Sequence, residues 1–183
     1  DEETRRKLAS LGYVGSFSGK MVSDKEALHD PKDKIEIFNM LGAAKELTLR
    51  GRAKEAVLIA EQILQDDPEI IDAYSTLGNI YFAGQDYDEA LSHFLRVFEL
   101  KPNNAFNLIN IANCYLSLGK IDEAEKIIED SLEFLIPDSL IYYYLGRIKK
   151  LNGDYDLAMF LLFKCIEMNS FSASGYSELG TVY

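Results

Sequence analysis

Apolar and small residues recur every three or four positions within residues 71–104, in two runs separated by Gly84 and Gln85. This spacing places side chains on one face of a helix, so the pattern predicts two amphipathic helices over residues 71–84 and 87–100. A single helix pair cannot bury its own apolar face, so further pairs are expected on either side. The residues of the pattern are Tyr74, Leu77, Gly78 and Tyr81 in the first run, and Ala90, Phe94 and Val97 in the second.

Small and turn-forming residues mark the crossing and the ends of this helix pair. Gly78 and Ala90 permit a close approach of the two helix axes. Asp86 is expected to accept hydrogen bonds from the free N–H groups at the start of the second helix. Pro102 is expected to end that helix.

The pattern recurs at a spacing of 34 residues, and this periodicity resembles that of the tetratricopeptide repeat. The resemblance implies an all-α solenoid of antiparallel helix pairs, stacked into a right-handed superhelix. The repeats are expected at about 37–70, 71–104, 105–138 and 139–172, with a partial fifth over 173–183. Positions below are counted from the first residue of each repeat.

The first helix is expected ahead of the repeat phase, from about Pro31 to Arg50, because Asp30 suits an N-cap and Pro31 a first helical position. Residues 1–30 do not follow the repeat, and we expect a short helix and a linker there. The fifth repeat supplies only a first helix, so its surface over residues 173–183 would be covered by a continuation of the chain or by a neighbouring molecule. The other helices are expected at about 53–66, 71–84, 87–100, 105–118, 121–134, 139–152 and 155–168.

Residues 3–15 (ETRRKLASLGYVG) and 30–44 (DPKDKIEIFNMLGAA) resemble the C-terminal junction of certain bacterial sulfatase-like enzymes. In those proteins tetratricopeptide repeats follow a catalytic domain of the alkaline phosphatase superfamily. The resemblance implies an extracytoplasmic parent protein, periplasmic or membrane-associated; without it, a cytoplasmic location is the alternative. The sulfatase nucleophile signature, Cys or Ser followed by x-Pro-x-Arg, is absent, so the chain itself is not expected to be an enzyme.

Composition and charge limit the classes of partner that are expected. The chain has 183 residues, 48% of them hydrophobic, and a net charge of −11. Phosphate backbones need a basic footprint, so nucleic acid is not an expected partner. No apolar run reaches the length that spans a bilayer, so membrane insertion is not expected. The two cysteines, Cys114 and Cys165, and two isolated histidines form no metal-binding motif, and we expect no cofactor.

The resemblance places a ligand groove on the concave face, where the first helices present positions 2, 5, 9 and 12. Asparagine can both donate to and accept from a peptide backbone, and apolar neighbours can hold side chains, so the expected ligand is an extended peptide or an amphipathic helix of a protein partner. The predicted groove residues are Lys45, Asn79, Phe82, Phe106, Ile109, Asn113, Tyr143, Arg147 and Lys150.

Two alternatives stay open at this point. Aromatic residues on the inner face can equally be packing between adjacent repeats. The repeats can also be a structural appendage that packs on a parent catalytic domain or on another copy, with the groove filled in cis by residues 1–20, whose apolar side chains are Leu8, Leu11, Tyr13, Val14 and Phe17.

Charged residues near the groove allow two interpretations. A subgroup of the tetratricopeptide-repeat family holds a ligand's C-terminal carboxylate with Lys and Asn at fixed groove positions. This chain does not match that carboxylate-clamp pattern, because position 5 carries no lysine in any repeat. Arg147, Lys149 and Lys150 could fix a ligand carboxylate, but a solvated cationic end of a helix is the favoured interpretation. His93, at position 23, is expected to be mostly exposed.

Overall fold

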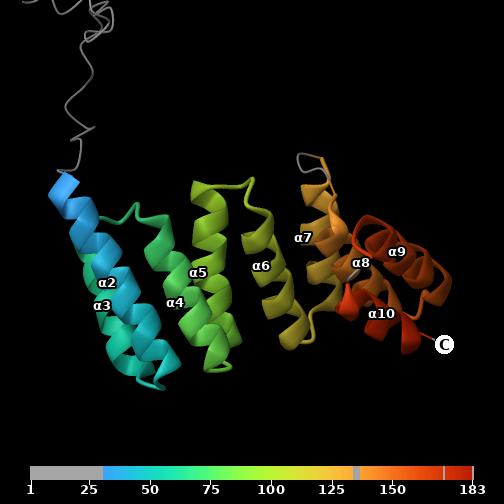
Figure 1. Cartoon of the computed structure of the whole chain (residues 1–183), viewed down its shortest axis with the longest axis horizontal. Coiled ribbons are helices and arrows are strands. Elements are labelled where there is room, and N and C mark those ends of the chain that lie inside the picture. Colours follow the sequence, from blue (N-terminus) through green and yellow to red (C-terminus); the bar gives the residue numbers. More distant parts are fainter. Residues whose placement is uncertain (1–30, 134–136, 171, 183) are drawn as a thin grey trace, which may run out of the picture. The chain divides into compact units, whose positions relative to one another are not determined.

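The computed structural model describes residues 31–133, 137–170 and 172–182, and within these residues the chain forms helices and no strands (Figure 1). The predicted all-α solenoid is confirmed, while the handedness of its superhelix stays a prediction. The largest difference in bounds is at α7, which ends at Ser131 rather than near residue 134. The helices are α2 Pro31–Leu49, α3 Ala53–Asp66, α4 Ile71–Ala83, α5 Tyr87–Leu100, α6 Ala105–Ser117, α7 Ile121–Ser131, α8 Ser139–Leu151, α9 Tyr155–Met168 and α10 Ala173–Gly180.

Residues Glu36–Tyr183 group into one unit, and in it helices that follow one another along the chain pack side by side (Figure 1). The core runs through the unit as a series of apolar clusters that join neighbouring repeats. One cluster joins Ala90 and Phe94 of α5 to Ile111 and Cys114 of α6. Each repeat therefore buries its apolar face against the next one, as the sequence pattern predicts. No described helix combines the length and apolar character that a membrane span requires.

In repeats 2 and 4 the crossing of the two helices depends on a glycine at position 8, where repeats 1 and 3 have Ala44 and Ala112. A Cβ atom added to Gly78 would lie 2.6 Å from Cε1 of Phe94, and one added to Gly146 would lie 2.8 Å from Cγ of Leu162. Both partners stand at position 24, so the glycine makes room for a large buried side chain on the second helix. Ala90, which we expected to share the crossing with Gly78, is buried but is not the residue nearest to it.

The turn inside each repeat uses a left-handed residue at position 15. Gly51, Gly119 and Gly153 have φ between 73° and 80°, and Gln85 adopts φ 66° at the same position. The predicted turn at Gly84 and Gln85 is thereby confirmed.

The predicted cap at Asp86 is wrong, because its side chain accepts no hydrogen bond from the start of α5. Asp154 has nearly the same backbone angles and does accept a hydrogen bond from the backbone N–H of Leu157. The backbone conformation therefore permits the cap at both positions and does not account for its absence at Asp86.

Candidate functional site

Four first helices carry a polar side chain at position 9: Lys45 on α2, Asn79 on α4, Asn113 on α6 and Arg147 on α8. Their surroundings differ. Lys45 and Asn79 are exposed, whereas Asn113 and Arg147 are half-buried. The row predicted from the sequence is thus divided into an accessible half in repeats 1 and 2 and an enclosed half in repeats 3 and 4.

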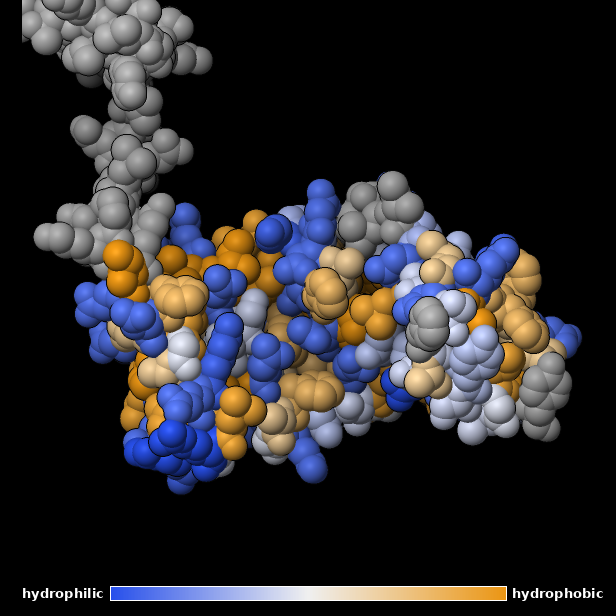
Figure 2. Space-filling view, viewed as in Figure 1, coloured by the Kyte–Doolittle hydropathy of each residue, from blue (hydrophilic) through white to orange (hydrophobic). Residues whose placement is uncertain are grey.

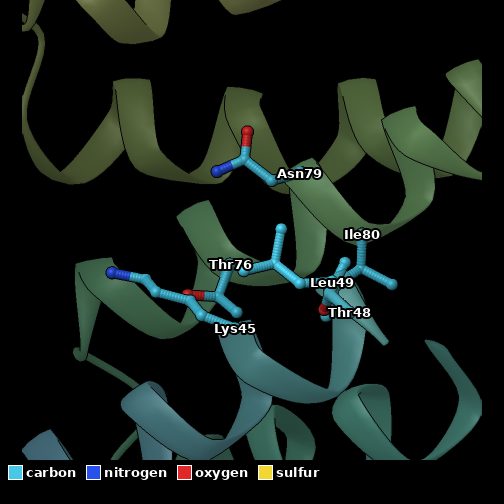
Figure 3. A pocket seen from close by; sticks show the side chains of 6 residues that line it. All are labelled: Lys45, Thr48, Leu49, Thr76, Asn79 and Ile80. Atoms are coloured by element: carbon cyan, nitrogen blue, oxygen red, sulfur yellow. The ribbon is translucent and has the colours of Figure 1, made fainter. Parts of the chain in front are cut away.

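A pocket of about 230 Å³ lies between α2 and α4 (Figure 3). Figure 3 shows Lys45 and Asn79 on two different helices, with Leu49 between them. Among the described residues neither Lys45 nor Asn79 has a hydrogen bond or an ion pair. Their polar ends are therefore available to a ligand. The pocket is lined by Lys45, Thr48, Leu49, Thr76, Asn79 and Ile80.

The two threonines of the pocket are bound to their own helices. The hydroxyl of Thr48 donates to the carbonyl oxygen of Ala44 at 2.8 Å, and that of Thr76 donates to the carbonyl oxygen of Asp72 at 2.7 Å. Spacing alone could have found Thr48, because it stands at position 12. Thr76 and Ile80 stand at positions 6 and 10, which carried no such signal, and the sequence analysis missed them.

In repeats 3 and 4 three of the predicted groove residues contact the same side chain, that of Tyr144. The side-chain amide of Asn113 donates to the hydroxyl of Tyr144 at 2.8 Å. The guanidinium of Arg147 lies 6.0 Å from the centroid of the same ring, and Tyr143 meets that ring edge-on at 5.2 Å. Burial raises the pKa of the Tyr143 hydroxyl. These side chains form a network that ties α6 to α8.

The two lysines that follow Arg147 are also engaged. Lys149 forms ion pairs with Glu125 and Glu129 of α7, and Lys150 pairs with Glu178 of α10. All are charged partners across helices, and both lysine side chains are only about one-fifth exposed. The interpretation of a solvated cationic helix end is therefore wrong, because α7 and α10 neutralise these charges.

The three remaining predicted groove residues have different environments. Ile109 is only 5% exposed and belongs to the core cluster that joins repeats 3 and 4. Phe82 is half-buried, and its ring lies 5.3 Å from that of Tyr87. Phe106 is 76% exposed. Of the three, Phe106 is the one whose side chain is largely open to a ligand.

His93 lies in an aromatic cluster rather than on an open surface. Its ring stacks on Tyr81 with centroids 5.4 Å apart and lies 6.2 Å from the ring of Tyr74. Burial lowers the pKa of His93, while the carboxylates of Glu89 and Glu61 oppose that shift. The expected exposure of His93 is wrong, because these tyrosines cover part of its ring.

The two cysteines lie in the core, away from the pocket between α2 and α4. Cys114 and Cys165 are buried, as predicted, and burial raises the pKa of Cys114 to about 12, so its thiol stays protonated and weakly nucleophilic near neutral pH. No three His, Cys, Asp or Glu side chains in the described part of the chain are grouped so that they could hold a metal ion.

Comparison with known proteins adds two family matches. Residues 140–171 match the family model described as the tetratricopeptide repeat. Residues 50–131 match the model described as anaphase-promoting complex, cyclosome, subunit 3. Each match covers less than half of the chain.

Among curated proteins, the chain is similar to Hsp70-Hsp90 organizing protein 3 of Arabidopsis thaliana, with 32% identity over 93 residues. That match covers 51% of this chain and 17% of the relative, so the chain spans about a sixth of that protein.

Solved structures share the fold. MamA from Desulfovibrio magneticus RS-1 superposes with a TM-score of 0.69 at 16% identity, covering 80% of this chain and 82% of the other. YrrB, described as a TPR protein with an unusual peptide-binding site, superposes with a TM-score of 0.65 at 18% identity, covering 83% of this chain and 78% of the other. Residues 140–171 thus match the tetratricopeptide repeat, and the described part of the chain shares the fold of these solved structures.

Proposed function

We propose that this chain is a non-catalytic protein-interaction module that binds a peptide or helix of a protein partner on the inner face of its first helices. The observation that carries the proposal is the pocket between α2 and α4, which brings together two groove residues predicted from the sequence, Lys45 and Asn79. YrrB, with the same fold, is described as having a peptide-binding site.

The chemistry of the pocket indicates how a peptide would bind. The ammonium group of Lys45 can bind a carboxylate or a backbone carbonyl, and the amide of Asn79 can both donate to and accept from a peptide bond. Leu49 is exposed at the end of α2 and offers an apolar contact. A volume of about 230 Å³ is below the range of pockets for drug-sized ligands and suits one side chain of an extended peptide.

The structural alternative concerns residues that the structure does not describe. If residues 1–20 fill the groove in cis, the repeats act as an appendage of a larger protein. The sulfatase-like parent inferred from residues 3–15 and 30–44 is not supported by the matches reported above and stays a prediction, as does the extracytoplasmic location that depends on it.

A peptide array probed with the purified chain tests the proposal. Peptides that bind are then titrated against the Lys45→Ala and Asn79→Ala variants. Loss of one charge-assisted hydrogen bond should raise Kd by roughly 10- to 100-fold for Lys45→Ala. Lys54→Ala removes an exposed lysine from α3, outside the pocket, and serves as the matched control with unchanged affinity.

A chain without residues 1–20 separates the two alternatives. If peptides bind only after this deletion, the groove is occupied in cis. If peptides bind the intact chain but tolerate both pocket substitutions, the assignment of the site to α2 and α4 is wrong.

A further inference from the structure

The surface of α9 carries aromatic side chains that the other described helices leave about half exposed. Tyr155, Phe160 and Phe163 are 55%, 57% and 51% exposed. Hydrophobic side chains, tan to orange in Figure 2, gather at the end of the view where Figure 1 places α9. Exposed apolar patches of this kind mark interaction surfaces.

The same positions of the other second helices are mostly polar. Phe160 and Phe163 stand at positions 22 and 25. The residues at these two positions are Leu58 and Glu61 on α3, Ser92 and Leu95 on α5, and Lys126 and Glu129 on α7. The repeat therefore does not require aromatic residues there, and the pair on α9 needs a separate explanation.

Charges of opposite sign flank Phe160 along one row of the helix surface. Asp156 lies four residues before it and Lys164 four residues after it, so the three side chains are on the same stripe of α9. Lys164 pairs with Glu167 at 2.8 Å in a contact whose side chains are 43% and 69% exposed. Such a surface pair contributes little and can be exchanged for another.

We propose that this face binds the α9 of a second copy of the chain in an antiparallel, two-fold arrangement. With Phe160 of both copies at the axis, Asp156 of each copy lies opposite Lys164 of the other. A two-fold contact must be self-complementary, and a row of negative, aromatic and positive side chains meets that condition. We call Asp156, Phe160, Phe163 and Lys164 the α9 face, because helix geometry places these four side chains within one sector of the α9 surface, which Tyr155 lies outside.

The size of the α9 face fits a weak dimer. An aromatic side chain buries about 150–250 Å² when fully covered, so half-exposed side chains add roughly 100 Å² each. Four such side chains give at most about 400 Å² per copy and about 800 Å² in total, below the size of a standard interface, so the expected dimer is weak. The other second helices expose carboxylates, such as Asp88, Asp122 and Asp130, which disfavour contact between copies elsewhere.

Sedimentation equilibrium of the full chain over a range of micromolar concentrations tests this dimer. Phe160→Ser removes the central contact and should raise the dimer Kd by roughly 10-fold or more. Asp156→Lys and Lys164→Glu each place like charges opposite one another at two sites of the interface, and each alone should raise Kd by about tenfold. Circular dichroism confirms that each variant keeps its helical content.

Mixing the two charge variants gives the decisive result. One copy with Asp156→Lys and one with Lys164→Glu restore both opposite-charge pairs, so the mixture should associate more tightly than either variant alone. Asp122→Lys changes the same repeat position on α7 and should leave the dimer unchanged. A chain that stays monomeric at high concentration, or a dimer that tolerates Phe160→Ser and is not rescued by mixing, overturns the proposal.

Discussion

Replacing Gly78 by alanine measures how tightly the two helices of repeat 2 cross. In the native fold a Cβ at this position would lie 2.6 to 2.8 Å from three atoms of the Phe94 ring. Phe94 is 1% exposed, so the ring has little room to move aside. We therefore expect Gly78→Ala to destabilise the fold, although alanine is the better helix former.

The magnitude follows from two opposing terms. Overpacking of a closed core costs about 1–3 kcal/mol, and replacing a helical glycine by alanine gains about 1 kcal/mol. Because the crowded atoms belong to a rigid ring, the cost should lie in the upper part of its range. The net loss is then about 1–2 kcal/mol, or a fall in Tm of roughly 2–8 °C for a chain of this size.

Gly42→Ala is the matched control, because nothing lies within 4 Å of a Cβ at that position in α2. It should gain about 1 kcal/mol from the same change in helix propensity. Urea unfolding followed by circular dichroism gives both values, and their difference isolates the packing cost. If Gly78→Ala stabilises the chain as much as Gly42→Ala does, the crowding at Phe94 has been overestimated and the argument fails.

Three further predictions concern charged side chains. Burial lowers the pKa of His93, so the unfolded chain binds a proton at this side chain more tightly than the folded chain does. The free energy of unfolding should therefore fall as the pH drops below about 6.5. Urea titrations from pH 8 to 5 should show a weaker fall for His93→Gln. Lys149→Met should cost about 2–3 kcal/mol in urea unfolding, because the partly buried carboxylate of Glu125 loses its ion pair and keeps only its hydrogen bond from Asn152. Adding Glu125→Leu should restore most of this loss, and equal losses in both variants would contradict the pairing. Lys150→Ala should speed hydrogen exchange of the α10 amides and leave those of α4 unchanged, because its ion pair attaches α10 to α8.

The fold could be predicted because the 34-residue period repeats the same helix signals several times. Most helix bounds lie within one residue of their predicted positions. The exception is α7. In its repeat the expected proline stands one position further along the chain, at Pro137, so the sequence gives no signal for a helix end near residue 131. The residue at position 15 also adopts the same left-handed backbone conformation in four repeats, although Gln85 replaces glycine in one of them.

The candidate site could be predicted only in part, because spacing fixes the face of a helix and not the partners of a side chain. Lys45 and Asn79 share a pocket, as neighbours at position 9 should. Asn113 stands at the same position, yet its amide is bound to Tyr144. That contact joins residues far apart in the sequence and depends on the rotamers of both.

Burial at one repeat position also varies with its neighbours. Ile109 and Tyr143 both stand at position 5, but Ile109 is buried while Tyr143 is half-buried. Lys149 replaces an aromatic residue at position 11, a departure visible in the sequence. Only the structure shows which partners Lys149 has, because it places the acidic residues of α7 beside this side chain.

The short helix α7 gives the joint between repeats 3 and 4 a distinct character. It has 11 residues, against 14 in α3, α5 and α9, a difference of about 4.5 Å in length. Beside the apolar cluster at this joint, Lys149, Glu125 and Glu129 supply an electrostatic link. In a linear array whose stability is the sum of its repeats and joints, this joint would weaken as salt screens its charges. The joint that Lys150 and Glu178 make between α8 and α10 would weaken in the same way. At higher ionic strength the repeats on either side of the joint between α7 and α8 would therefore unfold with less cooperativity between them.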